Sequence, residues 1–363
     1  MTLTLILFVL GFVLLIGGAE WLVRGASQLA AAAGIAPLVV GLTVVAFGTS
    51  APELAVSVQS AYLGQSDLAL GNVIGSNICN ILLILGLAAL VAPLTVAQKL
   101  LRLDVPLMIG VSVLLFLLAL DGEIGRLDGA LLFAGILAYV VFSIVQSRRE
   151  TRQVQEEYAR EYGVEAATGG GGLLRNLGLV AIGLVLLVLG ARWLVDGAVL
   201  IARLAGVSEL IIGLTVVAVG TSLPEIAASV VASLRGERDI AVGNAIGSNL
   251  FNIMAVLGLT GLVAPEGIVA PSAALNFDLP VMIAVAVACL PIFFTGHRIA
   301  RWEGALFLGY YAAYLAYLVL EATDHDALPA YSATMLWFVL PLTGLTVAVT
   351  VYNAWRSGPE NNY

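Results

Sequence analysis

Charged residues are scarce in this chain of 363 residues: only 11% are charged, whereas 60% are hydrophobic and the mean hydropathy is +1.02. A soluble protein of this size needs more polar side chains than this to cover its surface. The composition therefore excludes a soluble protein. Cysteine and histidine are also scarce, with two of each: Cys79, Cys289, His297 and His325. The cysteines fall in apolar stretches and the histidines in expected loops, so they form no zinc, haem or disulfide framework.

Long apolar runs fill most of the chain. A run of about 20 apolar residues is long enough to cross a bilayer as a helix, and the lack of ten-residue alternation argues against a transmembrane β-barrel. The sequence therefore predicts an all-α polytopic membrane protein. Its eleven expected spans are 3–23, 36–62, 71–92, 104–120, 127–146, 176–200, 208–234, 240–264, 278–295, 302–320 and 332–355. Residues 1–10 lack the basic residues of a signal peptide, so the first span is expected to be retained.

The chain contains an internal duplication. Residues 41–87 align without a gap with residues 213–259, and more than half of the aligned positions are identical. Each copy contains five spans, an odd number, so the second copy is expected to insert upside down relative to the first. The predicted parts are a first five-helix repeat at 1–146, a flexible linker at 147–175, an inverted second repeat at 176–320, and an extra helix with a tail at 321–363.

Basic residues fall mainly on one side of this topology. With the N-terminus outside, the inner loops, the linker and the tail hold all of them except Arg126, Arg192 and Arg203. This distribution agrees with the positive-inside rule and predicts a cytoplasmic linker. Within the duplicated WLVxGA element, Arg24 falls inside and its counterpart Asp196 falls outside, as inversion requires.

Each repeat interrupts one span with a proline and a glutamate, in GTSAPE at 48–53 and GTSLPE at 220–225. Pro52 and Pro224 lack an N–H and clash with the carbonyl four residues earlier, which breaks the helix. A half-helix that ends there directs its partial negative charge at the gap, which suits a cation. Within a bilayer such a break is tolerated where it lines a cavity or a polar path. A kink used only for packing is the alternative.

Glu53 and Glu225 are costly inside a membrane, and no Lys or Arg lies in the same part of either repeat. Brought together, the two carboxylates would repel each other unless a proton or a cation intervened. The polar side chains around them carry oxygen, which hard cations prefer, and Ca²⁺ takes 6 to 8 such ligands. The candidate oxygen donors are Thr49, Ser50, Ser57, Ser76 and Asn80 in the first repeat and Thr221, Ser222, Ser229, Ser248 and Asn252 in the second.

A second polar stretch follows each break, as GNVIGSNICN at 71–80 and GNAIGSNLFN at 243–252. A spacing of four residues places a trio of polar side chains on one helix face; the trios are Asn72, Ser76 and Asn80, and Asn244, Ser248 and Asn252. Gly75 and Gly247 are expected to let a neighbouring helix approach closely. Hydrogen bonding between helices is the alternative role for four asparagines: Asn72, Asn77, Asn244 and Asn249.

These paired signatures resemble those of the cation/Ca²⁺ antiporter superfamily, in particular its sodium/calcium exchanger branch, over residues 1–320. The resemblance implies two inverted groups of five spans and four midplane ion sites that carry one Ca²⁺ or three Na⁺ in alternation. It implies that Ca²⁺ is held by Glu53, Glu225 and the carbonyls of Thr49 and Thr221. It also implies that the flanking Na⁺ sites are completed by Ala46, Ser50, Ser76, Ala218, Ser222 and Ser248.

The chain departs from this pattern at two places. Some exchangers, especially K⁺-dependent ones, have Asp where this chain has Asn252. The missing carboxylate argues against K⁺ co-transport and weakens the case for three Na⁺. The second departure is the eleventh span, since ten are usual; it is a candidate packing or dimerisation helix.

The sequence predicts a Na⁺-driven Ca²⁺ antiporter of the cell (inner) membrane, which is not an enzyme, needs no cofactor and binds no nucleic acid. Spans 1 and 6 are expected to slide past a fixed ion cage on smooth surfaces that glycines provide. These glycines are Gly11, Gly17 and Gly18 in span 1 and Gly178, Gly183 and Gly190 in span 6.

Other functions were weighed against this prediction. H⁺ could exchange for Ca²⁺ on the same fold, with Glu53 and Glu225 as proton carriers, and a K⁺-dependent exchanger is a further alternative. An intramembrane protease would need paired Asp residues, which neither signature supplies. A channel tolerates similar oxygen rings, but the inverted duplication favours alternating access. Asp104 and Asp278, each two residues before a proline, are expected only to cap helices.

Overall fold

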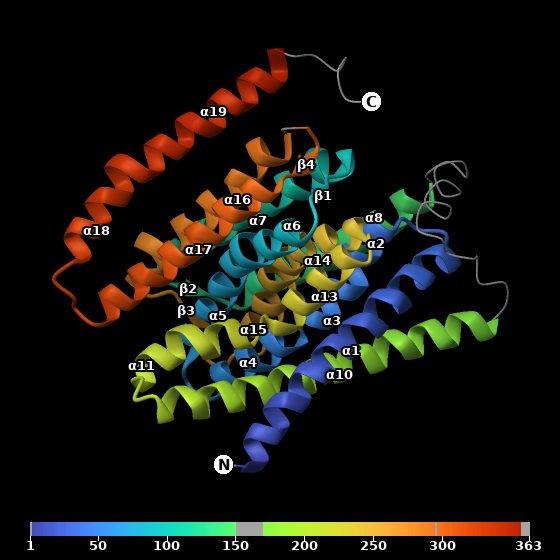
Figure 1. Ribbon diagram of the computed structural model, residues 1–363, viewed down its shortest axis with the longest axis horizontal. Helices are drawn as coiled ribbons and strands as arrows, with labels where there is room; N and C mark the ends of the chain where they lie inside the picture. The colour runs from blue at the N-terminus through green and yellow to red at the C-terminus, as the bar shows by residue number, and fades with distance from the viewer. Residues whose placement is uncertain (1, 150–169, 295, 357–363) are drawn as a thin grey trace.

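The structure, a computed structural model, describes residues 2–149, 170–294 and 296–356. It is a bundle of long helices with short strands at its two ends (Figure 1). The elements of the first repeat are α1 Thr2–Ala33, α2 Pro37–Val40, η1 Gly41–Val45, α3 Ala46–Thr49, α4 Ala51–Tyr62, α5 Ser66–Cys79, η2 Asn80–Leu85, α6 Gly86–Val91, β1 Leu94–Thr95, η3 Leu100–Asp104, α7 Val105–Leu118, η4 Ala119–Asp121, β2 Glu123–Ile124 and α8 Arg126–Arg148.

The second repeat and the C-terminal segment follow the same plan, and the η segments are π-helical turns except for η4, a 3₁₀ turn. Their elements are α10 Gly170–Leu204, α11 Glu209–Ile212, η5 Gly213–Val217, α12 Ala218–Gly220, α13 Leu223–Leu234, α14 Arg238–Phe251, η6 Asn252–Leu257, α15 Gly258–Val263, β3 Ile268–Val269, η7 Ala274–Asp278, α16 Leu279–Phe294, β4 Arg298–Ile299, α17 Arg301–Ala322, α18 Leu328–Thr334, η8 Met335–Val339 and α19 Leu340–Arg356.

The described helices confirm a polytopic membrane protein. Nine of them are long and apolar enough to cross a bilayer, or ten if the bent pair Pro37–Thr49 and Ala51–Tyr62 counts as one span. The equivalent span of the second repeat, expected at 208–234, is divided at its break into two shorter pieces, so the described residues give no span of full length there. The count of eleven therefore stays a prediction.

Helices α1 and α10, the first of each repeat, pack against each other along most of their length (Figure 1). Gly11 contacts the backbone of Gly190, and Gly18 contacts that of Gly183, so residue numbers rise on one helix as they fall on the other. Equivalent helices of the two repeats thus run antiparallel. This is the inverted arrangement that the odd number of spans predicted.

Reciprocal contacts repeat the same relation elsewhere. Gly86 of α6 packs against Gly304 of α17, and Gly258 of α15 packs against Gly129 of α8. Since α15 is the repeat-equivalent of α6 and α8 that of α17, the two contacts are the same contact with the repeats interchanged. The short strands do likewise, because β1 pairs with β4 and β2 pairs with β3. We call these two ends of the bundle the β1–β4 end and the β2–β3 end.

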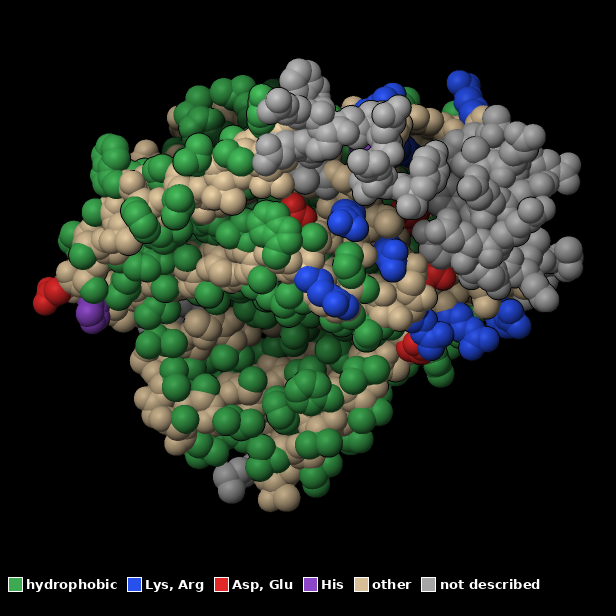
Figure 2. Space-filling model, turned by 45° about the horizontal axis from the view of Figure 1, so that its top comes forward, with side chains coloured by type: hydrophobic (Ala, Val, Ile, Leu, Met, Phe, Trp, Pro, Cys, Tyr) green, Lys and Arg blue, Asp and Glu red, His purple; other side chains and the backbone are tan. Residues whose placement is uncertain are grey.

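The surface has the composition expected of a membrane protein. Figure 2 shows Lys and Arg side chains gathered on part of one face, beside a broad area that is largely hydrophobic. Most of the predicted linker, 147–175, lies outside the described residues, so its flexibility and the four predicted domain boundaries stay predictions.

The C-terminal segment α18–η8–α19 lies along the outside of α16 and α17 (Figure 1). It carries several exposed large apolar side chains, among them Trp337 and Phe338. The predicted extra helix therefore exists as a separate apolar layer at the edge of the bundle.

Candidate ion-binding site

Both predicted helix breaks are present and lie inside the bundle. In the first repeat α3 ends at Thr49 and α4 begins at Ala51, with a bend of 43° between the two pieces. In the second repeat α12 ends at Gly220 and α13 begins at Leu223. The proline of each signature occupies the first turn of the new helix, where its missing N–H costs nothing.

Glu53 and Glu225 lie in the first turns of α4 and α13, where the positive end of the helix dipole favours a negative charge. Their exposed fractions are 0% and 1%. Both carboxylate oxygens of Glu53 and Oε2 of Glu225 have no hydrogen-bond partner within 3.5 Å among the described residues. The two carboxyls lie near enough to repel each other. Two such buried acids need a proton or a cation between them.

The two breaks exchange side chains across the interface between the repeats. Ser50, in the first break, donates a hydrogen bond from Oγ to Oε1 of Glu225 at 3.5 Å, and Thr49 also lies beside Glu225. In the second break Thr221 lies beside Glu53. Each acid therefore lies next to at least one hydroxyl of the opposite repeat.

The hydroxyls predicted to complete the site are buried as well. The exposed fractions of Ser76, Ser222 and Ser248 are 3%, 0% and 0%. The Oγ atoms of Ser222 and Ser248 have no hydrogen-bond partner among the described residues. Orphaned buried hydroxyls next to two acids fit a cation site, because an ion would supply the missing interaction.

Asn80 and Asn252 are held by a reciprocal pair of hydrogen bonds between the repeats. Asn80 donates from Nδ2 to Oδ1 of Asn249 at 3.0 Å, and Asn252 donates from Nδ2 to Oδ1 of Asn77 at 3.1 Å. The side-chain Oδ1 atoms of Asn80 and Asn252 are buried and have no hydrogen-bond partner among the described atoms. Asn77 and Asn249 thus orient two oxygen donors through hydrogen bonds between helices, which is the alternative role that the sequence offered for them.

Asn72 and Asn244 hydrogen-bond to the backbone of the two acids. Asn72 donates from Nδ2 to the backbone oxygen of Glu53 at 3.2 Å and to Oγ of Ser57 at 3.0 Å, and Asn244 makes the equivalent two bonds in the second repeat. The alternative role of hydrogen bonding between helices is therefore confirmed for these asparagines. They fix the turn that carries each glutamate.

The two repeats differ in how closely their broken span packs. A Cβ atom at Gly247 of α14 would lie 2.7 Å from Leu42 of η1, as expected for a close approach. The same expectation for Gly75 of α5 is wrong, since nothing lies within 4 Å of that position. Ala46 is accordingly buried while its counterpart Ala218 is exposed. The broken span is therefore sealed in the first repeat and loosely packed in the second.

The predicted helix caps at Asp104 and Asp278 are wrong. The π-helical segments η3 and η7 run directly into α7 and α16, so neither residue begins a helix. Instead Tyr139 donates a hydrogen bond to Oδ1 of Asp104 at 3.0 Å, and Tyr314 donates one to Oδ1 of Asp278 at 3.4 Å. The acids tie neighbouring helices together within each repeat.

Basic side chains do not neutralise the site. The ion pairs found in the described part of the chain join Arg203 to Glu209 and Arg235 to Glu20, and neither reaches the site acids. No cluster of three or more His, Cys, Asp or Glu occurs among the described residues. Two carboxylates with neutral hydroxyl, amide and carbonyl oxygens are the donor set of a hard cation.

A helical membrane protein with two inverted repeats and an oxygen-rich site between broken helices has the architecture of a secondary transporter. The chain belongs to the sodium/calcium exchanger protein family, which matches it over residues 3–145 and 175–320. This confirms the resemblance drawn from the two signatures. Members of the family are exchangers and antiporters rather than enzymes.

Individual relatives are similar to this chain over most of their length. The sodium/calcium exchanger MaX1 of Methanosarcina acetivorans is 34% identical over 347 residues, which cover 87% of this chain and 99% of MaX1. The inner membrane protein YrbG of Escherichia coli strain K12 is 40% identical over 318 residues, 88% of this chain and 97% of YrbG. A solved structure of the sodium-calcium exchanger NCX_Mj has a TM-score of 0.75 at 30% identity, covering 87% of this chain and 98% of NCX_Mj.

Proposed function

We propose that this protein exchanges Na⁺ for Ca²⁺ across the membrane by alternating access. The observation that carries the proposal is the pair of buried acids, Glu53 and Glu225, each facing oxygen atoms of the opposite repeat and neither facing a basic side chain. A bound Ca²⁺ neutralises both carboxylates, and Na⁺ ions can do the same in the other half of the cycle. Repulsion between the acids otherwise disfavours a site without ions.

The proposed ligands are those that surround the two acids. Ca²⁺ is held by Glu53, Glu225 and the backbone carbonyls of Thr49 and Thr221. The Na⁺ positions use Ala46, Ser50, Ser76, Asn80, Ala218, Ser222, Ser248 and Asn252. The orphaned oxygens of Asn80 and Asn252 support the inclusion of the two amides.

Access to the site changes from one end of the bundle to the other. The loosely packed η5 is, in the proposed cycle, the side on which the site opens, toward the β2–β3 end, while the contact of η1 with α14 keeps the β1–β4 end closed. In the proposed cycle the α1–α10 pair slides along its glycine contacts and exchanges these two arrangements. The antiparallel pair suits this motion, because a shift that opens one end closes the other.

Na⁺ is the proposed coupling ion because the relatives MaX1 and NCX_Mj are named as sodium/calcium exchangers. Neutral Asn252 in place of a third carboxylate disfavours K⁺ as an additional substrate. The name of YrbG supports an inner-membrane location. The charge bias supports an external N-terminus and a cytoplasmic linker, which places the β1–β4 end inside.

Flux measurements test the proposal. In proteoliposomes loaded with Na⁺, the wild-type protein should take up ⁴⁵Ca²⁺ only while the Na⁺ gradient lasts. Glu53→Gln and Glu225→Gln should each abolish this uptake, because an amide cannot replace a carboxylate charge. Glu123→Gln, which changes an exposed acid of β2, is the matched control and should transport normally.

The same vesicles separate the coupling ions. Uptake driven by a pH gradient without Na⁺ would establish H⁺ exchange in place of Na⁺ exchange. Uptake that requires K⁺ would establish the K⁺-dependent alternative. Normal uptake by both glutamine variants would refute the site.

A further inference from the structure

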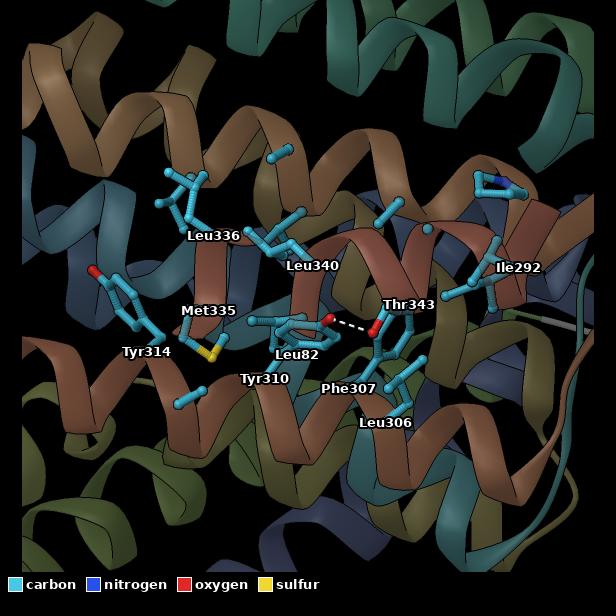
Figure 3. A pocket seen from close by; sticks show the side chains of 18 of the residues that line it. Leu82, Ile292, Leu306, Phe307, Tyr310, Tyr314, Met335, Leu336, Leu340 and Thr343 are labelled. Carbon is cyan, nitrogen blue, oxygen red and sulfur yellow. Dashed lines mark hydrogen bonds between the residues drawn. The ribbon is translucent and has the colours of Figure 1, made fainter. Parts of the chain in front are cut away.

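A large apolar cavity lies at the C-terminal edge of the bundle. It has a volume of about 1130 Å³ and lies between α16 and α17 on one side and α18–η8–α19 on the other. Figure 3 shows its labelled side chains, which are mostly apolar and converge from both walls. We call it the C-terminal groove. The family match ends at residue 320, so the outer wall of the groove lies beyond the matched residues.

We propose that the C-terminal groove binds the acyl chains of a membrane phospholipid. All the residues that line it belong to segments that can span a bilayer, namely Ser66–Val91, which contributes Leu82, Ala274–Phe294, Arg301–Ala322 and Leu328–Tyr352. The groove therefore lies at the depth of the hydrocarbon, where acyl chains are the surrounding solvent. Water gains too few hydrogen bonds in such an apolar space, and an empty space of this size loses packing contacts.

Small residues on facing walls create the space. Ala284 and Ala288, one helical turn apart on α16, line one wall, and Gly344 and Ala348, one turn apart on α19, line the other. A Cβ atom at Gly344 would meet nothing within 4 Å. Larger side chains at these positions would fill the groove, so its volume is a property of this sequence.

Two hydrogen bonds across the groove select a flexible occupant over a helix. Tyr310 of α17 donates to Oγ1 of Thr343 of α19 at 2.6 Å (Figure 3), and Tyr331 of α18 donates to the backbone oxygen of Ala313 at 2.8 Å. The walls touch at these two points. A helix with its side chains is about 10 Å wide, so a helix of a second copy cannot pass between them, whereas an acyl chain can thread past.

The test compares a double variant that adds bulk inside the groove with one that adds bulk outside it. Ala288→Phe with Gly344→Leu should fill the groove, while Val287→Phe with Leu345→Phe adds bulk at exposed positions outside it. Each full-length protein is purified in mild detergent, washed extensively and analysed by native mass spectrometry. We expect wild type and the control variant to keep a bound phospholipid, and the groove-filled variant to lose it while it still transports Ca²⁺.

Three results would overturn the proposal: no retained phospholipid on the wild type, equal retention by the groove-filled variant, or a wild-type dimer that this variant alone converts to a monomer. The last result would assign the groove to a second copy. Should the groove-filled variant not fold, wild type loaded with a diazirine-tailed phospholipid and then washed gives the answer by itself. Crosslinks at Val285 and Val347 support the groove, and crosslinks confined to exposed positions exclude it.

Discussion

The individual side chains of the proposed ion site divide into proposed ligands and residues that orient them. Asn249 and Asn77 make no predicted contact with an ion, yet each accepts the amide hydrogen of the asparagine whose carbonyl is left free. Residues of this kind are as important to a metal site as the ligands, because they fix the direction of the donor atom.

Asn249→Ala should therefore weaken Ca²⁺ binding without abolishing transport. Loss of its Oδ1 frees the Asn80 amide to rotate, and loss of an orienting partner commonly lowers metal affinity about 10- to 100-fold. The measurement is the Ca²⁺ concentration that gives half-maximal uptake. Thr346→Ala, which removes a hydroxyl bonded only to Leu342 on the exposed face of α19, is the control. An unchanged Ca²⁺ dependence for Asn249→Ala would show that Asn80 needs no such support.

At this scale the sequence singled out the two candidate acids, which the structure buries, but it did not say which asparagines pair with one another. Glu53 and Glu225 were recognisable because a carboxylate beside a helix break, without a basic partner nearby, has few structural roles in a membrane. The pairing of Asn80 with Asn249 joins positions 169 residues apart. It depends on how two inverted helices cross, which spacing along the chain does not specify.

Among the elements, α1 and α10 are the pair whose packing is set by glycine. Gly18→Leu should separate them, because even a Cβ at this position would lie 2.8 Å from the Gly183 oxygen. Overpacking of this kind costs about 1–3 kcal/mol and should slow exchange more than it lowers the melting temperature. Gly17→Leu is the matched control, since nothing lies within 4 Å of its Cβ position. Equal rates for the two variants would argue against sliding along this contact.

The glycine pattern was therefore only partly predictable. Gly11, Gly18, Gly183 and Gly190 form the contact, but Gly17 and Gly178 face open space. A glycine in the sequence indicates only that a neighbouring helix can approach closely at that position. Which glycines are used depends on where the partner helix crosses.

Helix α1 is also attached to the turn between α13 and α14 at the β1–β4 end. Ser27 donates a hydrogen bond to Oε1 of Glu237 at 2.7 Å, and Glu20 pairs with Arg235. The repeat-equivalent positions on α10 and the α4–α5 turn hold Arg192, Val199, Leu63 and Gln65, which offer no such ion pair. Attachment at one end only favours the arrangement in which that end is closed.

This attachment should make exchange depend on pH. Burial is the main cause that raises the pKa of Glu237 and nearby Asp239 raises it further, while the Ser27 hydroxyl and Arg235 oppose the shift. Since the folded pKa lies above the usual Glu value, the buried position is most stable at low pH and loses stability as pH rises through the raised pKa. Exchange should therefore slow as the pH on that side falls.

Two variants check this mechanism through pH profiles of uptake. Glu237→Gln resembles the protonated acid. Its uptake rate should therefore stay at the slow, low-pH value and no longer change with pH on the acid side of the profile. Ser27→Ala removes the hydrogen bond and should raise the rate at low pH. A profile of wild-type shape in Glu237→Gln would exclude Glu237 as the titrating group.

For the whole molecule, the inverted duplication could be predicted from the sequence, whereas the different packing of the two repeats could not. The sequence predicted two inverted repeats because the aligned segments are alike and each holds an odd number of spans. It could not predict that η1 is mostly buried while Gly213 and Val217 of η5 are exposed, since both segments read GLTVV. The proposed alternating access accounts for this difference between identical sequences, because only one end of such a transporter is open at a time.

Ala46 and Ala218 occupy equivalent positions and report this asymmetry directly. Ala218 is exposed and Ala46 is 0% exposed, so a cysteine at 218 should react with a membrane-impermeant maleimide and a cysteine at 46 should not. The native Cys79 and Cys289 are buried and should give little background. With the N-terminus outside, the reaction at 218 should occur in intact cells, and Ca²⁺ or Na⁺ should protect the thiol because Ala218 borders the proposed site. Denatured samples, in which both cysteines must react, control for labelling chemistry. Reaction at 218 only in inside-out vesicles would reverse the assigned topology, and equal reaction at both positions would contradict an opening at one end.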